Sequence, residues 1–178
     1  MSKKSFPLPK SPWSAWTWAH SDGHSRQQGT SEHHDLVVAH HAWVWAPLVG
    51  CVISNRNHTF DIVKATKECV INIPTVELSK KVVDCGNSSG RTVDKFKEFS
   101  LTAMPASCVQ APLIDECYAN LECKVVNEKM VAKYNFFILE VLKAWTDPLM
   151  KHPQTLHHLG EGAFMVAGET IHLPSKMK

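Results

Sequence analysis

The chain has 178 residues, of which 44% are hydrophobic and 20% are charged. This length and composition predict one globular domain with a single core, and they exclude a disordered chain. The formal net charge of +2 is too small to indicate a protein that binds nucleic acid or a membrane surface.

Residues 12–46 form a segment without a clear pattern. They hold five tryptophans and six histidines, and only Asp35 to Ala39 is typical of a strand. The doublets His33-His34 and His40-His41 are good ligand types for a metal, but no carboxylate or thiolate lies at a motif spacing from them. We therefore assign no metal site, and we interpret the tryptophans as packing residues rather than as a stacking platform.

A clear pattern begins with a continuous apolar run, Leu48 to Ile53, which predicts a strand buried on both faces. A polar turn follows, and then Phe60 to Ala65 is typical of a short helix that the Thr59 hydroxyl can cap. Free amides, the positive end of the helix dipole and the guanidinium of Arg56 would meet in this turn and favour an anion such as phosphate. The alternative is an ordinary turn with a capping threonine.

The next two predicted elements are a strand and a helix. Cys69 to Ile73 is a short apolar run that Pro74 ends, so it predicts a buried strand. Val76 to Asp84 has apolar residues at helical spacing and predicts a helix. Gly86 follows, where a left-handed residue is easily placed at the end of the helix.

A second polar loop, Asn87 to Arg91, is dense in small hydrogen-bond donors and ends in another guanidinium. Thr92 is predicted to cap a short amphipathic turn that follows, with Phe96 as its apolar residue. Two loops with an arginine each, on either side of the predicted strand at residues 69–73, suggest one phosphate-sized pocket between them. The alternative is two surface loops with solvated arginines.

The rest of the chain is typical of β structure. Ala119 to Val126 alternates apolar and polar residues and predicts a half-buried strand. Tyr134 to Trp145 predicts a long strand that forms a hairpin with it. Ala163 to Ala167 predicts a final short strand. Short strands with two or three short helices favour a β-barrel with peripheral helices over a parallel α/β sheet.

Four motifs of this chain occur in the order of a known family: PLVGCVISNRNHTFDIVKATKECVINIPTVEL, CGNSSGRTVDKF, APLIDECYANLECKVV and HHLGEGAFMVAGE. Together they resemble the flavin reductase-like, FMN-binding split-barrel family, and most of all its flavoredoxin branch, over about residues 47–178. The resemblance implies a mainly β fold, a split β-barrel of Greek-key type with about six strands and a few short peripheral helices. It also implies FMN as the cofactor and a homodimer with FMN near the interface.

The resemblance implies a set of cofactor-binding residues on both polar loops and in a later turn. On the phosphate side these are Ser54, Asn55, Arg56, Asn57 and Thr59, in the second loop Ser89, Arg91 and Lys95, and in the later turn His158. We interpret His158 as a turn-capping residue in the first instance, and as a proton donor near the flavin only as the weaker alternative. No catalytic residue is assigned, because hydride transfer to a flavin needs no acid–base group from the protein.

The N-terminal part departs from the family pattern. Residues 1–46 should supply the first two strands of the barrel, but the segment rich in threonine, serine and tryptophan that would lie against the flavin ring is not evident there. Val37 to His41 can be encoded by GTC-GTG-GCA-CAC-CAT, and reading these codons one base later gives Ser-Trp-His-Thr, which resembles that segment. One hypothesis is therefore that part of Pro12 to Ala46 is translated from a shifted reading frame, and a divergent N-terminal segment is the competing one. We treat 1–46 as an atypical segment and 47–178 as the flavin reductase-like domain, and we assign no flavin-ring contacts between residues 12 and 46.

The resemblance implies an FMN-dependent oxidoreductase that transfers electrons from NAD(P)H or from a protein donor. The alternatives are a flavoredoxin-type electron carrier without NAD(P)H activity, and a barrel that has lost flavin binding. The six cysteines include no C-x-x-C pair, so we expect free thiols and no zinc or iron–sulfur site. No apolar run approaches the roughly 18 residues of a membrane span and no signal sequence is evident, so we expect no membrane, no nucleic acid and a cytoplasmic location.

Overall fold

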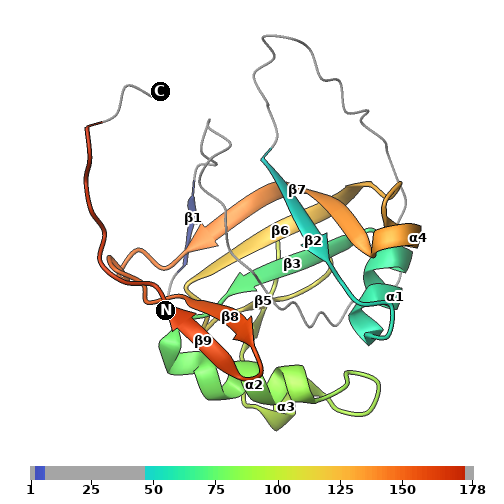
Figure 1. The fold of residues 1–178 in the computed structure, drawn as a ribbon, viewed down its shortest axis with the longest axis horizontal. Helices are drawn as coiled ribbons and strands as arrows, with labels where there is room; N and C mark the ends of the chain where they lie inside the picture. The colour runs from blue at the N-terminus through green and yellow to red at the C-terminus, as the bar shows by residue number, and fades with distance from the viewer. Residues whose placement is uncertain (1–2, 7–46, 175–178) are drawn as a thin grey trace.

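The computed structural model describes residues 3–6 and 47–174 (Figure 1). The strands are β1 (Lys4–Phe6), β2 (Leu48–Val52), β3 (Glu68–Ile73), β4 (Ala103–Met104), β5 (Leu113–Ile114), β6 (Ala119–Asn127), β7 (Phe136–Thr146), β8 (Leu156–Gly160) and β9 (Ala163–Val166). The helices are α1 (His58–Thr66), the 3-10 helix η1 (Val76–Leu78), α2 (Ser79–Asn87), α3 (Lys95–Glu98) and α4 (Val131–Tyr134). No helix among these residues is long and apolar enough to cross a membrane.

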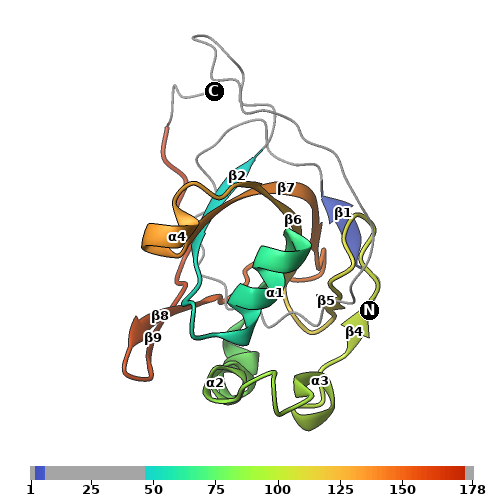
Figure 2. The ribbon, with the colours of Figure 1, turned by 90° about the vertical axis from the view of Figure 1, so that its right-hand side faces the viewer.

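Within the described residues, five strands form one antiparallel sheet around the long strand β7. One edge of β7 pairs with β6, which in turn pairs with β3. The other edge is shared, because β2 pairs with Phe136–Glu140 and β1 with Ala144–Thr146. Two register shifts between β6 and β7 increase the local bend, and Figure 2 shows the sheet curled, with α1 at its open end.

The main core lies between the curled sheet and α1. Phe60 and Val63 of α1 are buried against Phe137 and Leu139 of β7, both of which have no exposed surface. The rings of Phe60 and Phe137 meet edge to face, with 5.4 Å between their centroids, which is a favourable aromatic geometry. Cys69 and Cys123 are buried in the same cluster, and Cys51 packs against it, as small apolar residues do.

A second, smaller core covers the other face of the sheet, so the prediction that the strand at 119–126 is half-buried was wrong. Val109, Ala111 and Leu113 pack there against Val70 of β3. Of the polar side chains of β6 that were expected to face solvent, Asn120 and Glu122 have no exposed surface, whereas Lys124 is half-buried. The segment before β5 forms this cover, which alternation along a single strand cannot reveal.

Several other local predictions also need correction. The strand at 48–52 is confirmed, but not its burial on both faces, because Leu48 and Val52 are 36% and 56% exposed. Helix α2 continues to Asn87, and Gly86 is not among the residues with positive φ. The cap of α3 is Asp94, whose side chain accepts a hydrogen bond from the amide of Lys97, and not Thr92. A carboxylate is a stronger N-cap than a threonine hydroxyl.

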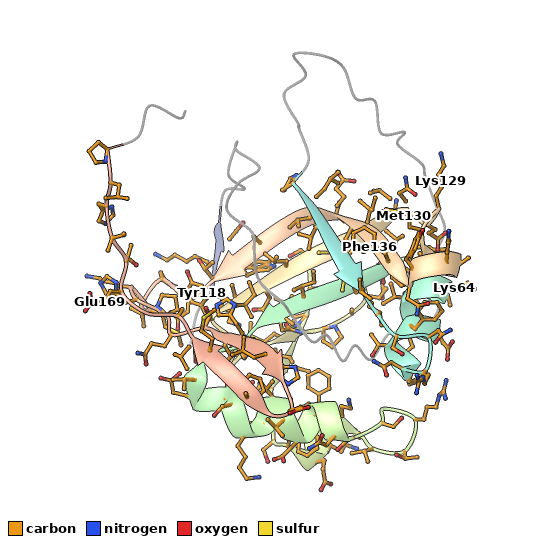
Figure 3. The ribbon with its side chains drawn as sticks, viewed as in Figure 1. Lys64, Tyr118, Lys129, Met130, Phe136 and Glu169 are labelled. Carbon is orange, nitrogen blue, oxygen red and sulfur yellow. The ribbon has the colours of Figure 1, made fainter. Side chains whose placement is uncertain are left out.

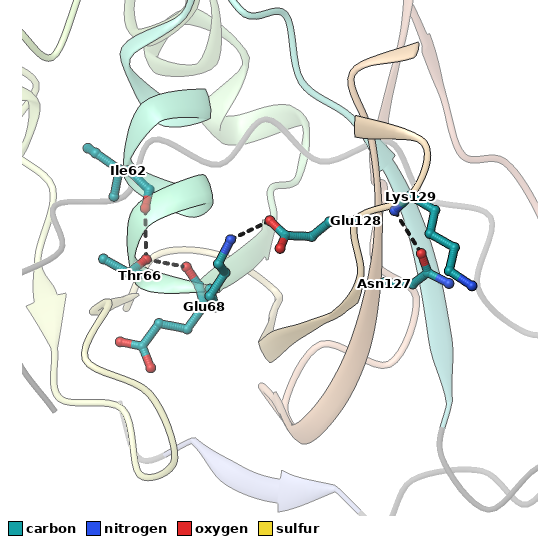
Figure 4. Close-up of polar contacts among 7 residues, drawn as sticks. Ile62, Thr66, Glu68, Asn127, Glu128 and Lys129 are labelled. Carbon is teal, nitrogen blue, oxygen red and sulfur yellow. Dashed lines mark hydrogen bonds and ion pairs between the residues drawn. The ribbon is translucent and has the colours of Figure 1, made fainter. Parts of the chain in front are cut away.

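The C-terminal end of α1 is fixed to the turn that leads into α4 (Figure 4). The Thr66 hydroxyl donates to the carbonyl of Ile62 at 2.9 Å, and Lys67 forms an ion pair with Glu128. The amide of Val125 donates to the carbonyl of Lys67 at 2.8 Å. Figure 3 shows Lys64, Lys129 and Met130 at this end of the molecule. These contacts orient α1 so that its N-terminal end points toward α2 and α3.

Residues 7–46 lie outside the described residues, and with them the histidine doublets and the segment to which the frame-shift hypothesis applies. Lys4–Phe6, by contrast, is part of the main sheet. The ammonium of Lys3 donates to the Ile114 carbonyl at 2.8 Å and to the Asn120 side chain at 2.6 Å. Residues 3–6 are therefore anchored to the domain, although the sequence placed them in the atypical segment.

Candidate functional site

A pocket of about 260 Å³ lies where the N-terminal end of α1 faces the end of α2. Its wall consists of residues 56–59 and Ile62 on one side, residues 85–90 on the other, and Lys95 and Phe96 of α3. Segments about 30 residues apart in sequence thus enclose one cavity, as the two polar loops predicted. Figure 2 shows α2 and α3 below α1.

The first loop is a compact turn between β2 and α1. Ile53 is buried, and its amide donates to the Asn135 carbonyl at 3.0 Å, which fixes the end of β2. The Asn57 amide donates to the carbonyl of Ser54 at 2.9 Å and closes the turn. Helix α1 starts at His58, so Asn57 occupies the cap position, and it makes no side-chain cap bond. The expectation that Thr59 caps this helix was wrong, because Thr59 already lies within its first turn.

The start of a helix leaves backbone amides without partners in the helix itself. Together with the helix dipole they favour an anion at this end of α1. Arg56 lies on the pocket wall and its side chain is exposed. This side of the pocket therefore offers positive charge from a guanidinium and from the helix end.

The second loop is held mostly by its own hydrogen bonds. The Ser88 hydroxyl donates to the Asp84 carbonyl at 2.8 Å, which ties the loop to the last turn of α2. The Thr92 hydroxyl donates to the Ser89 carbonyl at 3.2 Å, and the Val93 amide donates to the same carbonyl at 3.1 Å. These bonds curl residues 88–93 into a tight loop, and residues 88–90 form part of the pocket wall.

Lys95 is the buried cation of the site. It is only 7% exposed, and its ammonium donates to the Cys85 carbonyl at 2.7 Å. A buried ammonium is costly unless hydrogen bonds or counter-charges compensate it, and the carbonyl at the end of α2 provides one such bond. Lys95 therefore holds α3 against α2 and adds positive charge to the wall of the pocket.

Arg91 lies differently from what the two-arginine prediction assumed. Its guanidinium donates to the carboxylate of Asp61 at 2.5 Å, and both side chains are more than half exposed. Arg91 is not part of the pocket wall, although its loop is. The two loops do meet, but the structure brings Arg56 and Lys95 to the cavity and places Arg91 in a surface ion pair with α1.

The remaining predicted residues divide into two groups. Those on the pocket wall, besides Arg56 and Lys95, are Asn57, Thr59 and Ser89. Ser54, Asn55 and His158 are not on it. His158 lies within β8 and not in a turn, and its ring packs on Phe164 with 4.8 Å between centroids.

Sequence reasoning missed His58, which also lies on the pocket wall. Its Nδ1 atom is buried and has no hydrogen-bond partner among the described residues. The only signal for it was its position between two predicted site residues in the first loop. No group of three or more histidine, cysteine, aspartate or glutamate residues is arranged to hold a metal within residues 3–6 and 47–174.

A family profile described as "Flavin reductase like domain" matches residues 32–163. An uncharacterized protein of Archaeoglobus fulgidus is 38% identical over 95 residues, which is 53% of this chain and 54% of that protein. YddH, an uncharacterized protein of Escherichia coli, is 26% identical over 137 residues, 70% of this chain and 72% of that one. The chain thus spans about half the length of its archaeal relative.

Solved structures share the fold at low sequence identity. An FMN-binding domain of a flavin reductases-like enzyme from Shewanella baltica OS155 has a TM-score of 0.66 at 22% identity, over 72% of this chain and 74% of that one. The flavoredoxin of Desulfovibrio vulgaris (Miyazaki F) has a TM-score of 0.65 at 20% identity, over 71% and 73%. A putative flavin reductase with a split barrel domain from Shewanella frigidimarina NCIMB 400 has a TM-score of 0.62 at 20% identity, over 72% and 71%. The fold is therefore the split barrel, and the chain belongs to the flavin reductase-like domain family.

Proposed function

We propose that this chain binds FMN, with the phosphate of FMN in the pocket between residues 56–59 and 88–90, and that it acts as a flavin-dependent oxidoreductase. The observation that carries the proposal is the convergence of Arg56, Lys95 and the N-terminal end of α1 on one cavity. Similar structures named as FMN-binding support the choice of this flavin. The donor set suits a phosphate monoester, because it combines charge with several hydrogen-bond donors.

The size of the pocket fits part of FMN rather than all of it. Sites for whole cofactors span about 300–1,000 Å³, and this cavity has about 260 Å³. We infer that it takes the phosphate and the adjoining end of the ribityl chain, so that the flavin ring lies outside this wall. Ser89 and Asn57, which lie on opposite sides of the pocket, would orient the phosphate between them.

Bound FMN would supply the redox chemistry through its isoalloxazine ring, and the protein would supply position and electrostatics. Arg56 and Lys95 would neutralise the phosphate, and the core contacts of α1 would keep its N-terminal end in place. We propose NAD(P)H as the electron source, with a protein donor as the second candidate. The second candidate is favoured by the similarity to flavoredoxins from Desulfovibrio vulgaris and Methanosarcina acetivorans.

The test is flavin binding followed by turnover. The purified chain is mixed with FMN or with riboflavin, which lacks the phosphate, and quenching of flavin fluorescence gives the two affinities. We expect FMN to bind more tightly than riboflavin and Arg56→Ala to reduce this preference. A chain that takes up no FMN would contradict the proposal. NAD(P)H oxidation by the FMN-loaded protein then distinguishes the two electron sources. Negligible turnover in a yellow, FMN-loaded protein would favour a flavoredoxin-type carrier that takes electrons from a protein donor.

We also propose that the chain is a homodimer in the cytoplasm. One large apolar side chain on β9, Met165, is 53% exposed. Leu159, Ile171 and Leu173, which are near Met165 in sequence, are 67–75% exposed, and an interface between two copies would cover such apolar side chains. All six cysteines are free thiols, which suits a reducing compartment. Light scattering coupled to size-exclusion chromatography tests the dimer, and a monomer at micromolar concentration would contradict it.

A further inference from the structure

We infer that an exposed apolar surface next to the first loop, with three lysines around it, is a docking site for an acidic protein. Its apolar part comes from the end of β2, from α4 with the residue before it, and from the start of β7. We call it the β2–α4 surface, and it consists of Val52, Met130, Tyr134 and Phe136. Its role as the place where a protein electron donor binds rests on the proposed function, whereas the docking itself is tested without FMN.

The four residues are neighbours in the fold although they belong to different elements. Val52 and Phe136 lie directly opposite each other in the β2–β7 pair. A Cβ atom on Gly50 would lie 2.4 Å from the Phe136 ring, so this ring covers the backbone of β2. The Tyr134 amide donates to the Met130 carbonyl at 2.9 Å. Figure 3 shows Met130 and Phe136 at the same end of the molecule.

The β2–α4 surface is open to solvent. Val52 and Tyr134 are each 56% exposed, and Met130 is 38% exposed. Tyrosine, phenylalanine and methionine are enriched in the centres of protein–protein interfaces, and exposed apolar residues with a polar rim mark interaction sites. Strand β2 ends at Val52, and the first loop follows directly. A protein bound here would therefore lie beside the loop that forms one side of the pocket.

Three exposed lysines lie around this surface. Lys129 precedes α4, Lys133 lies within α4, and Lys64 is on α1. Figure 3 shows Lys64 and Lys129 at the same end of the molecule as Phe136. None of the three lysines forms an ion pair with a carboxylate of residues 3–6 or 47–174. Their positive charges are therefore available to a partner.

The carboxylates of the neighbouring elements face other cations. Glu128 forms an ion pair with Lys67, and Glu140 lies opposite Lys124 in the β6–β7 pair, where opposite charges attract. The three lysines thus determine the sign of the charge at the rim. A partner with carboxylates around an apolar centre complements both parts of the surface, and such complementarity gives an interface its specificity and its association rate.

The same charges disfavour a second copy of this chain as the occupant. In a two-fold dimer the same surface of both subunits meets, so the lysines of one copy would face those of the other. Nucleic acid is disfavoured as well, because the net charge of the whole chain is only +2 and the centre of the surface is apolar. An acidic protein is the occupant that fits both the charge and the apolar residues.

The probe is a short fluorescein-labelled peptide in which glutamates surround leucine and tryptophan, and its counterpart has lysine in place of each glutamate. Fluorescence anisotropy measures the affinities. One triple variant removes the charges of the rim, and it combines Lys64→Gln, Lys129→Gln and Lys133→Gln. The matched control removes the same charge from exposed lysines elsewhere, and it combines Lys80→Gln, Lys97→Gln and Lys151→Gln. Val52→Thr keeps the branched shape and the charge but makes the centre more polar.

We expect wild type to bind the acidic peptide and not the basic one. The triple variant of the rim should bind about tenfold more weakly, because each exposed ion pair contributes only modestly, and the control triple variant should stay within about twofold of wild type. Val52→Thr should bind about threefold more weakly, and salt at ~0.5 M should remove most of the binding. Carbodiimide crosslinking should join the peptide to the three rim lysines. Circular dichroism checks that each variant is folded.

The inference is overturned if wild type does not bind the acidic peptide, if both triple variants lose affinity equally, or if the crosslinks form at other lysines. Anionic phospholipid vesicles or an oligonucleotide that bind more tightly than the peptide, and only when the rim lysines are present, would also overturn it. A change of oligomeric state in Val52→Thr, measured by light scattering, would assign the surface to a second copy instead. These measurements contain no FMN, so a chain that docks the peptide and takes up no FMN would contradict only the proposed function.

Discussion

Glu122 allows a quantitative test of how buried polar groups hold this fold together. Its side chain has no exposed surface. Its carboxylate accepts hydrogen bonds from Trp145 Nε1 at 2.6 Å and from the backbone amides of residues 107–109 at 2.5–3.2 Å. Burial by itself raises the pKa of this carboxyl, but the bonds from Trp145 and from the three amides outweigh it and lower the pKa below the ordinary value.

The substitution Glu122→Gln keeps the shape of the side chain and replaces one acceptor oxygen by an NH₂ group. The remaining oxygen is best placed at Oε2, where it faces the amides of Cys108 and Val109. The NH₂ group then faces the indole N–H of Trp145, so one buried donor loses its acceptor and the negative charge is lost as well. One such loss costs about 1–3 kcal/mol. We expect a decrease of about 2–3 kcal/mol in the free energy of unfolding.

Urea denaturation followed by circular dichroism measures this change, and thermal unfolding should show a Tm lower by about 5–10 °C. Because the pKa of Glu122 is lowered in the folded state, its contribution is present above the ordinary glutamate pKa and is lost as the pH falls through the folded value. The difference between wild type and variant should therefore shrink below about pH 4. Trp145→Phe is the matched control. It removes the indole N–H donor and leaves the Glu122 carboxylate bonded to the backbone amides of residues 107–109. A Glu122→Gln variant within about 0.5 kcal/mol of wild type at neutral pH would refute the reasoning.

Three further predictions concern single residues of the structure, and a fourth concerns the coding sequence. Asp61→Asn should change the unfolding free energy by less than about 1 kcal/mol, because its pair with Arg91 is exposed, and urea titration checks this. Gly50→Ala should cost about 1–3 kcal/mol, since a Cβ there would lie 2.4 Å from the Phe136 ring, and Phe136→Ala in the same chain should restore part of the loss. Lys95→Met should weaken the binding of FMN more than the binding of riboflavin, as measured by the fluorescence assay. Resequencing codons 12–46 should reveal a single-base shift that restores a family-like segment, and an unchanged frame would leave the divergent segment as the explanation.

The sequence predicted the sheet well, because the signals are local. Three predicted strands form within a few residues of their expected bounds, namely Cys69–Ile73, Ala119–Val126 and the long strand that starts near Tyr134. Apolar residues with β-branched and aromatic side chains disfavour a helix at these positions. The helix at 76–84 is confirmed as well, although it begins with a 3-10 turn at Val76–Leu78.

What the sequence could not predict depends on contacts between distant segments. The second face of β6 is covered by the segment around Val109, and no alternation within β6 reports that cover. The direction of Arg91 is set by Asp61, 30 residues earlier in the chain. The sequence correctly predicted that both loops border one pocket. It could not predict which side chains line that pocket, because a side chain such as Arg91 can instead pair with a residue of α1, and the sequence alone does not rank these alternatives.

The two sides of the pocket differ in how firmly they are held, and this bears on how a ligand would be bound. Helix α1 is anchored along its whole length, through Phe60 and Val63 in the core and through Lys67 at its end. The second loop has no fully buried side chain between residues 88 and 94. It is held by hydrogen bonds within itself, by Lys95 and by the exposed ion pair of Arg91 with Asp61. A segment with few buried apolar contacts opens locally at low free-energy cost. The first loop is therefore the preorganised side of the site, and an anion that pairs Arg56 and Lys95 would lose part of its binding free energy to the ordering of the second loop.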